Sequence, residues 1–260
     1  PAAIITATGR NPETAGAVYP FPMIEDGDFA IPVVYTTDTL GEELAALAGS
    51  SVELVSDARR RPARGVNVVA RRGCTDGPRI VVCAHIDTKI GTPGALDNAA
   101  GTTVLLLLAQ RLRDYDGTPT VEIVALNGEE NYAVPGQMLY LERNRERMEQ
   151  IVVAVNLDAL GLRGSATAFS LYECPDPLAA TVRAAFGAQG GLVEGTPWPQ
   201  GDHMVFAMNG RPAVALASDR LTHILQELAH TERDTPDLLD YGTLDTAADA
   251  LAGLIAALRR

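Results

Sequence analysis

Short, nearly continuous apolar runs alternate with longer segments of helical pattern from residue 65 to the end of the chain. Apolar runs of about four to eight residues are typical of strands buried on both faces, whereas apolar positions three and four apart are typical of helices. The predicted strands are 66–70, 79–84, 121–126, 151–157 and 212–216. The predicted helices are 98–112, 137–149, 177–188 and 244–258. This alternation predicts an α/β fold whose mostly parallel, mixed central sheet carries helices on both faces.

The first part of the chain follows a different pattern. It is rich in proline, glycine and threonine, and its apolar runs are short. The expected elements are strands at 3–6, 31–35 and 51–55 and a helix at 40–48. The arginine-rich stretch 59–64 predicts a solvated linker. We therefore predict two parts, a small β-rich segment over residues 1–57 and the main domain over residues 58–260.

Composition removes several classes of function. The chain has 260 residues with 21 basic and 33 acidic side chains, and a net charge of −12 makes nucleic acid an unfavourable partner. The longest apolar run, 104–109, is too short to cross a membrane, which takes about 20 residues. Three cysteines without C-x-x-C spacing predict neither a disulfide framework nor a thiolate zinc site. The chain starts at Pro1, so we expect a soluble protein, cytoplasmic or secreted, whose native N-terminus lies outside this sequence.

Metal-binding side chains follow three of the predicted strands. They are His85 and Asp87, then Glu129 and Glu130, then Asp158. Ligands of open α/β sheets bind beyond the carboxyl ends of the strands, so these side chains are expected at one edge of the sheet. Their convergence there, rather than any single member, indicates a functional site.

Two further residues join this group. Asp97 lies in the loop after the strand 79–84, and His230 precedes a turn-rich loop before the last helix. Imidazole and carboxylate ligands without thiolate suit a catalytic zinc ion or a similar divalent metal. The carboxylates of this cleft would repel one another strongly, and two divalent cations would neutralise them.

Six blocks of sequence resemble the M28 family of zinc aminopeptidases, which are co-catalytic di-zinc exopeptidases. They occur in the family's order and reach from about Asn67 to the C-terminus. The blocks are 84–87, 93–101, 127–130, 156–161, 201–206 and 230–237. The resemblance implies a zinc-exopeptidase fold of the phosphorylase/hydrolase-like type.

The resemblance also implies a ligand set for two zinc ions, or for other divalent ions such as cobalt or manganese. Asp97 would bridge both metals. His85 and Asp158 would complete one metal site. Glu130 and His230 would complete the other.

Other roles follow from the same resemblance. Glu129 would be the general base, and Asp87 would hold the second ring nitrogen of His85 and fix its tautomer. His203 would line the pocket without binding metal, although a structural role is an equal alternative. The peptide bond between Asp97 and Asn98 is a candidate for the cis geometry found in the family.

Two positions depart from the family pattern. Gly201 stands where the family often has serine, and Arg211 precedes Pro212, where some relatives carry tyrosine or an aliphatic residue. At the edge of the pocket, Arg211 would contact the oxyanion or clamp a substrate carboxylate. A surface arginine is the alternative interpretation.

The implied function is a metal-dependent exopeptidase, first of all an aminopeptidase that hydrolyses peptides through a di-zinc-activated water. Residues 1–57 resemble part of a protease-associated (PA) domain, an insert that shapes substrate access in some M28 members. Three alternatives stay open: a carboxypeptidase or dipeptidase of the same fold, a glutaminyl-cyclase-like acyltransferase, and a transferrin-receptor-like binding protein that has lost its metals. All five ligand positions are occupied, which argues against the last. The sequence does not give side-chain specificity or oligomeric state.

Overall fold

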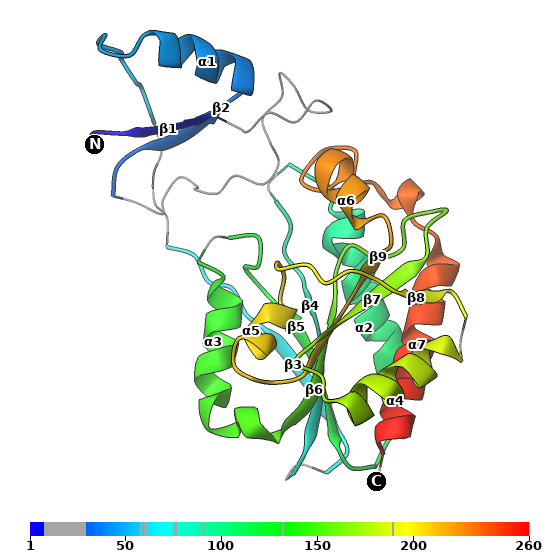
Figure 1. Ribbon diagram of the computed structural model, residues 1–260. Coiled ribbons are helices and arrows are strands. Elements are labelled where there is room, and N and C mark those ends of the chain that lie inside the picture. The colour runs from blue at the N-terminus through cyan, green and yellow to red at the C-terminus, as the bar shows by residue number, and fades with distance from the viewer. Residues whose placement is uncertain are drawn as a thin grey trace.

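A seven-stranded mixed sheet forms the centre of the molecule (Figure 1). The computed structural model describes residues 1–7, 30–57, 59, 62–74, 77–89, 91–131, 133–188 and 190–259. The sheet order is β3-β5-β4-β6-β9-β7-β8. The strands are β3 (Val68–Arg72), β4 (Arg79–His85), β5 (Thr120–Leu126), β6 (Ile151–Leu157), β7 (Thr167–Tyr172), β8 (Leu192–Glu194) and β9 (Ala213–Ser218). The four neighbours β5, β4, β6 and β9 run parallel, so their carboxyl ends share one edge. The predicted α/β fold with a mixed sheet is confirmed.

Helices cover both faces of this sheet (Figure 1). One face carries α2 (Ala100–Arg111), α4 (Asp176–Gly187) and α7 (Tyr241–Leu258), and the other carries α3 (Pro135–Asn144) and α5 (His203–Ala207). Side chains of β4 alternate between two cores: Ile80 and Val82 pack in the cluster with α2 and α7, whereas Val81 and Cys83 pack in the cluster with α3 and α5. Every residue of β4 is buried, which explains its continuous apolar run. Among the described helices, none combines the length and apolarity that a bilayer span requires.

Asn98 ties the start of α2 to the end of β6. Its side chain donates to the carbonyl of Leu157 at 2.8 Å and accepts from the N–H of Gly101 at 3.0 Å. The Asp97–Asn98 peptide bond is cis, as predicted. This junction lies in the segment Ala95–Ala99, whose backbone departs from helical geometry at Asp97 (φ −119°, ψ 84°) and Asn98 (φ −142°, ψ 43°).

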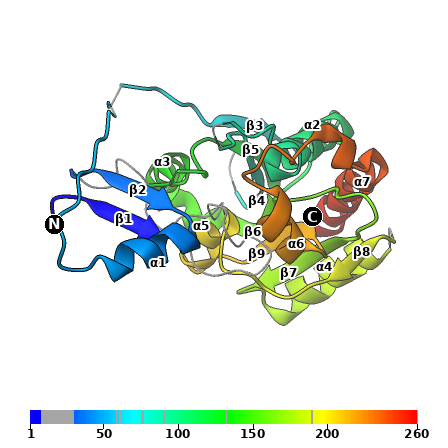
Figure 2. The same cartoon turned by 90° about the horizontal axis from the view of Figure 1, so that it is seen from above.

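The N-terminal elements form a separate small unit beside the main sheet (Figures 1 and 2). Strands β1 (Ile4–Ala7) and β2 (Val33–Thr36) pair in parallel, and α1 (Asp38–Ala46) follows them. These three elements confirm the strands predicted at 3–6 and 31–35 and the helix predicted at 40–48. The predicted strand 51–55 is wrong, because residues 51–57 are exposed, irregular chain with no strand beside them among the described residues. The likeness to a PA domain stays a prediction.

Candidate metal centre

Asp97 lies between two histidines that come from distant parts of the chain. Its Oδ1 is 3.1 Å from Nε2 of His85, and its Oδ2 is 3.1 Å from Nε2 of His230. The two oxygens of one carboxylate therefore face different imidazoles.

Each histidine also meets a second carboxylate. Asp158 Oδ1 is 3.5 Å from Nε2 of His85, and Glu130 Oε2 is 2.8 Å from Nε2 of His230. The five predicted ligands thus form two groups that share Asp97. All five side chains are largely buried, and the most exposed of them, Asp158, has 12% of its side-chain surface accessible.

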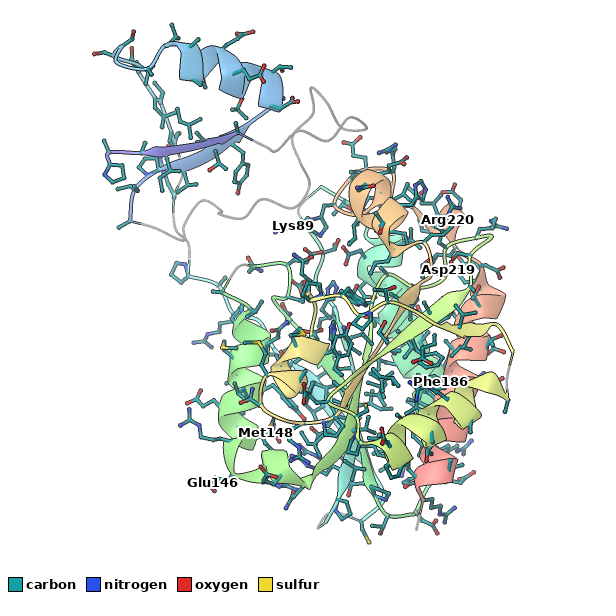
Figure 3. All side chains as sticks on the ribbon, in the orientation of Figure 1. Lys89, Glu146, Met148, Phe186, Asp219 and Arg220 are labelled. Atoms are coloured by element: carbon teal, nitrogen blue, oxygen red, sulfur yellow. The ribbon has the colours of Figure 1, made fainter. Side chains whose placement is uncertain are left out.

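The ends of the parallel strands place these residues. His85 is the last residue of β4, Asp158 directly follows β6, and Glu130 lies in the loop after β5. His230 follows the helical segment formed by α6 (Leu221–His223) and the π-helical turn Ile224–Leu228, and it has a φ of 61°, in the left-handed region that non-glycine residues rarely adopt. Lys89, at this end of the molecule in Figure 3, donates to the backbone carbonyl of Glu130.

A backbone carbonyl fixes the orientation of His85. Its Nδ1 is 3.0 Å from the carbonyl oxygen of Asp87, and because a carbonyl only accepts, Nδ1 carries the proton and Nε2 keeps its lone pair for the cleft. The Asp87 carboxylate is farther away, with Oδ1 at 3.9 Å from Nδ1. Asp87, the residue expected to hold the second ring nitrogen of His85, therefore does so through its backbone carbonyl.

The donor set fits a divalent metal ion. One ligand atom each from His85, Asp97 and Glu130 lies within 4.8 Å of the other two. Glu130 Oε1 is buried and has no hydrogen-bond partner among the described residues, so a buried lone pair is free for a cation. Two imidazole nitrogens with carboxylate oxygens and no thiolate are ligands that zinc accepts in catalytic sites.

Without a cation, protons balance the charges of this cleft. Burial disfavours charged His230, but Asp97 and Glu130 outweigh it and raise the pKa of His230 to about 10. The same balance between burial and the carboxylates of Asp158 and Asp97 raises the pKa of His85. Burial raises the pKa of Glu129 well above its usual value. The cleft therefore favours bound positive charge.

Asp234 supports the segment that carries Asp97, and the sequence analysis did not single it out. Its carboxylate accepts from the N–H of Leu96 at 2.7 Å and from the N–H of Asp97 at 3.0 Å. Asp234 is fully buried. A turn-rich acidic loop was the only signal in the sequence, and it could not reveal hydrogen bonds to a segment 137 residues away.

An aromatic group borders the centre on the side of Asp158. His203 is fully buried and donates from Nε2 to the carbonyl of Trp198 at 3.0 Å. The Trp198 ring meets the His203 ring edge-on with centroids 4.6 Å apart. Gly201 leaves space for the Trp198 ring, because a Cβ at position 201 would lie 2.9 Å from the nearest atom of that ring. Burial also raises the pKa of the neighbouring Asp202 to about 7.

Arg211 lies at the opposite end of the sheet, so the prediction that it contacts substrate is wrong. Its guanidinium donates to the carbonyl of Ile151, at the start of β6, and to Glu149 at 2.7 Å. Figure 3 shows the neighbouring residues Glu146 and Met148 at the end of the molecule away from Lys89. A residue that precedes a parallel strand stands at its amino end, and the metal centre is at the carboxyl ends.

The chain belongs to peptidase family M28, whose family model matches residues 67–255. Aminopeptidase YwaD of Bacillus subtilis is 25% identical over 141 residues, which cover 54% of this chain and 31% of that protein. The chain thus spans about a third of the length of this relative.

Solved structures share the fold. The aminopeptidase from Aneurinibacillus sp. strain AM-1 superposes with a TM-score of 0.77 at 22% identity, covering all of this chain and 64% of that one. A glutaminyl cyclase from an Acidobacteriales bacterium superposes with a TM-score of 0.62 at 20% identity, covering 73% and 72% of the two chains. Both peptidases and cyclases therefore use this architecture.

Proposed function

We propose that this protein is a di-zinc aminopeptidase in which Glu129 is the general base. One observation carries the proposal: the two oxygens of Asp97 each face a different histidine, and each histidine has a further carboxylate beside it. A single metal ion would use only one of these groups. Two ions sharing Asp97 would use both and would neutralise the acidic cleft.

Bound zinc would lower the pKa of a water molecule and polarise the scissile carbonyl. The chain supplies the proton transfer. Glu129 precedes the ligand Glu130, and its carboxylate interacts electrostatically with His85 and Asp158. Burial raises the pKa of Glu129, which makes its ionised carboxylate a stronger base than an exposed one. Glu129 would accept the proton of the attacking water and pass it to the leaving amine nitrogen.

The substrate class is a peptide with a free N-terminus. With the carboxylates of the cleft neutralised by the two ions, the free α-amine of the substrate would be held beside one of the metal sites, which would account for selection of a peptide N-terminus. Arg211, the residue that would favour a carboxypeptidase or dipeptidase, lies at the far end of the sheet. This leaves a glutaminyl cyclase as the main competitor, because that activity shares the fold.

Glu129→Gln tests the proposal. We expect this variant to bind the same amount of zinc as the unaltered protein and to lose about 10²–10⁴-fold in kcat, the usual contribution of a general base. Glu146→Gln, at an exposed position of the opposite end, is the matched control and should change neither quantity. Elemental analysis would measure the zinc, and aminoacyl p-nitroanilides would measure the rate.

A small substrate panel separates the remaining functions. Release of the N-terminal residue from a blocked-C-terminus peptide, with no action on an N-acetylated peptide, supports the aminopeptidase. Cyclisation of an N-terminal glutaminyl peptide without cleavage would support the cyclase instead. One zinc per chain with full activity would contradict the two-metal proposal.

A further inference from the structure

Three consecutive backbone N–H groups converge on the carboxylate of Asp87. Gly128 donates to Oδ1 at 2.7 Å, Glu129 donates to Oδ1 at 3.2 Å, and Glu130 donates to Oδ2 at 3.1 Å. Hydrogen bonds to an ionised acceptor are stronger than those between neutral groups. The loop that carries both glutamates is therefore attached to β4 through one side chain.

The loop conformation depends on Gly128. This residue has a φ of 93°, which L side chains rarely adopt, and an added Cβ would lie 2.7 Å from the ring of Pro135. The turn at Gly128 directs the following N–H groups toward Asp87. Gly128 and Asp87 therefore both determine the backbone conformation of residues 128–130.

The carboxylate of Asp87 can accept from the three loop N–H groups because it makes no hydrogen bond to His85. The backbone carbonyl of Asp87 already accepts from His85 Nδ1 at 3.0 Å, whereas Oδ1 is 3.9 Å from that nitrogen. Asparagine at position 87 would keep the backbone contact. It would also replace one acceptor oxygen by an NH₂ group, which cannot accept from an N–H.

We propose that Asp87 is a positioning residue for Glu129 and Glu130 and that it acts on the loop backbone rather than through His85. It holds the general base and one ligand of the Glu130–His230 metal site. The His85–Asp158 site is independent of its carboxylate. This inference rests on the proposed function only in the roles given to the two glutamates.

The first test needs neither zinc nor activity. In the metal-free protein we expect the amides of residues 128–130 to be protected from hydrogen exchange and to exchange about ten-fold faster or more in Asp87→Asn, as the loss of a hydrogen bond to a charged group implies. Asp234→Asn is the matched control: it should accelerate exchange at 96 and 97 and leave 128–130 unchanged. Unprotected amides at 128–130 in the unaltered protein would overturn the proposal, whatever the variants do.

The second test separates the two metal sites. With His230→Ala, only the His85–Asp158 site is complete; with His85→Ala, only the Glu130–His230 site is. Adding Asp87→Asn should weaken zinc binding about ten-fold in the His85→Ala background and less than about two-fold in the His230→Ala background. The reverse pattern would assign Asp87 to His85 and sink the proposal. If the unaltered protein binds no zinc, the proposed function fails and the exchange experiment still decides this one.

Discussion

Strand β4 has a buried ionic cluster at each end, and the two clusters balance their charges differently. At its first residue, Arg79 donates to Glu122 at 3.4 Å, and Glu122 also accepts from Arg71 and from Tyr140, both at 2.6 Å. At its last residue, His85 faces carboxylates that have no arginine or lysine side chain bonded to them among the described residues.

Only the cluster around Arg79 balances its charges without a bound ion. Arg79 and Glu122 are fully buried, and the protein itself supplies both signs of charge. At the other end the pKa of both histidines is raised, because neighbouring carboxylates favour a positive charge there. The amino ends of the strands thus hold a structural ion pair, and the carboxyl ends hold a site that favours a cation.

Removing the metal should cause the largest loss of stability and activity. The structural change should be confined to the cluster around His85. We expect a chelator to abolish peptidase activity and to lower the free energy of unfolding by about 4 kcal/mol if zinc was present at a thousand times its Kd. Amide exchange should increase at the ligand loops and not around Arg79. Full activity after complete zinc removal, verified by elemental analysis, would contradict this.

Glu122→Gln should have the opposite distribution of effects, because it changes the cluster around Arg79 and leaves the cluster around His85 intact. It leaves the Arg79 guanidinium buried without a counter-charge, so we expect a loss of about 3 kcal/mol in the free energy of unfolding. Zinc content and kcat should stay unchanged in the folded variant. Urea unfolding would measure the loss, with Glu142→Gln, an exposed position on α3, as the control. A variant with normal stability and reduced zinc would show that the two ends are coupled.

Arg211→Met should have the smallest effect. The Arg211 guanidinium pairs with a Glu149 side chain that is 89% exposed, and exposed pairs contribute less than about 1 kcal/mol. Its hydrogen bonds to the Ile151 carbonyl add about 1 kcal/mol to the expected loss in the free energy of unfolding. The preference between a dipeptide and its amide should not change. If the variant changed its preference between the dipeptide and the amide, Arg211 would have to contact the substrate after all.

The sequence predicted the strands and candidate ligands whose signals are local. The rule that ligands collect at the carboxyl ends of parallel strands brought together His85, Glu130 and Asp158, and Asp97 and His230 were added from the loops around them. The same rule, applied to Arg211 before β9, would have placed it at the amino end.

What the sequence missed depends on distant contacts or on short elements. Strand β7 mixes small, polar and aromatic residues in Thr167–Tyr172, and α5 has only five residues, so neither has a clear period. The hydrogen bonds that Asp87 and Asp234 accept come from backbone N–H groups, which every residue except proline carries, so they leave no pattern in the sequence.

Trp198 is the chain's only tryptophan, and its ring packs against His203, an imidazole whose pKa is lowered by burial although Asp158 acts in the opposite direction. Ultraviolet emission excited at the indole band therefore originates from a single fluorophore at the border of the acidic cleft. Titration with cobalt, which absorbs and quenches, would follow occupancy of the cleft in real time without a label.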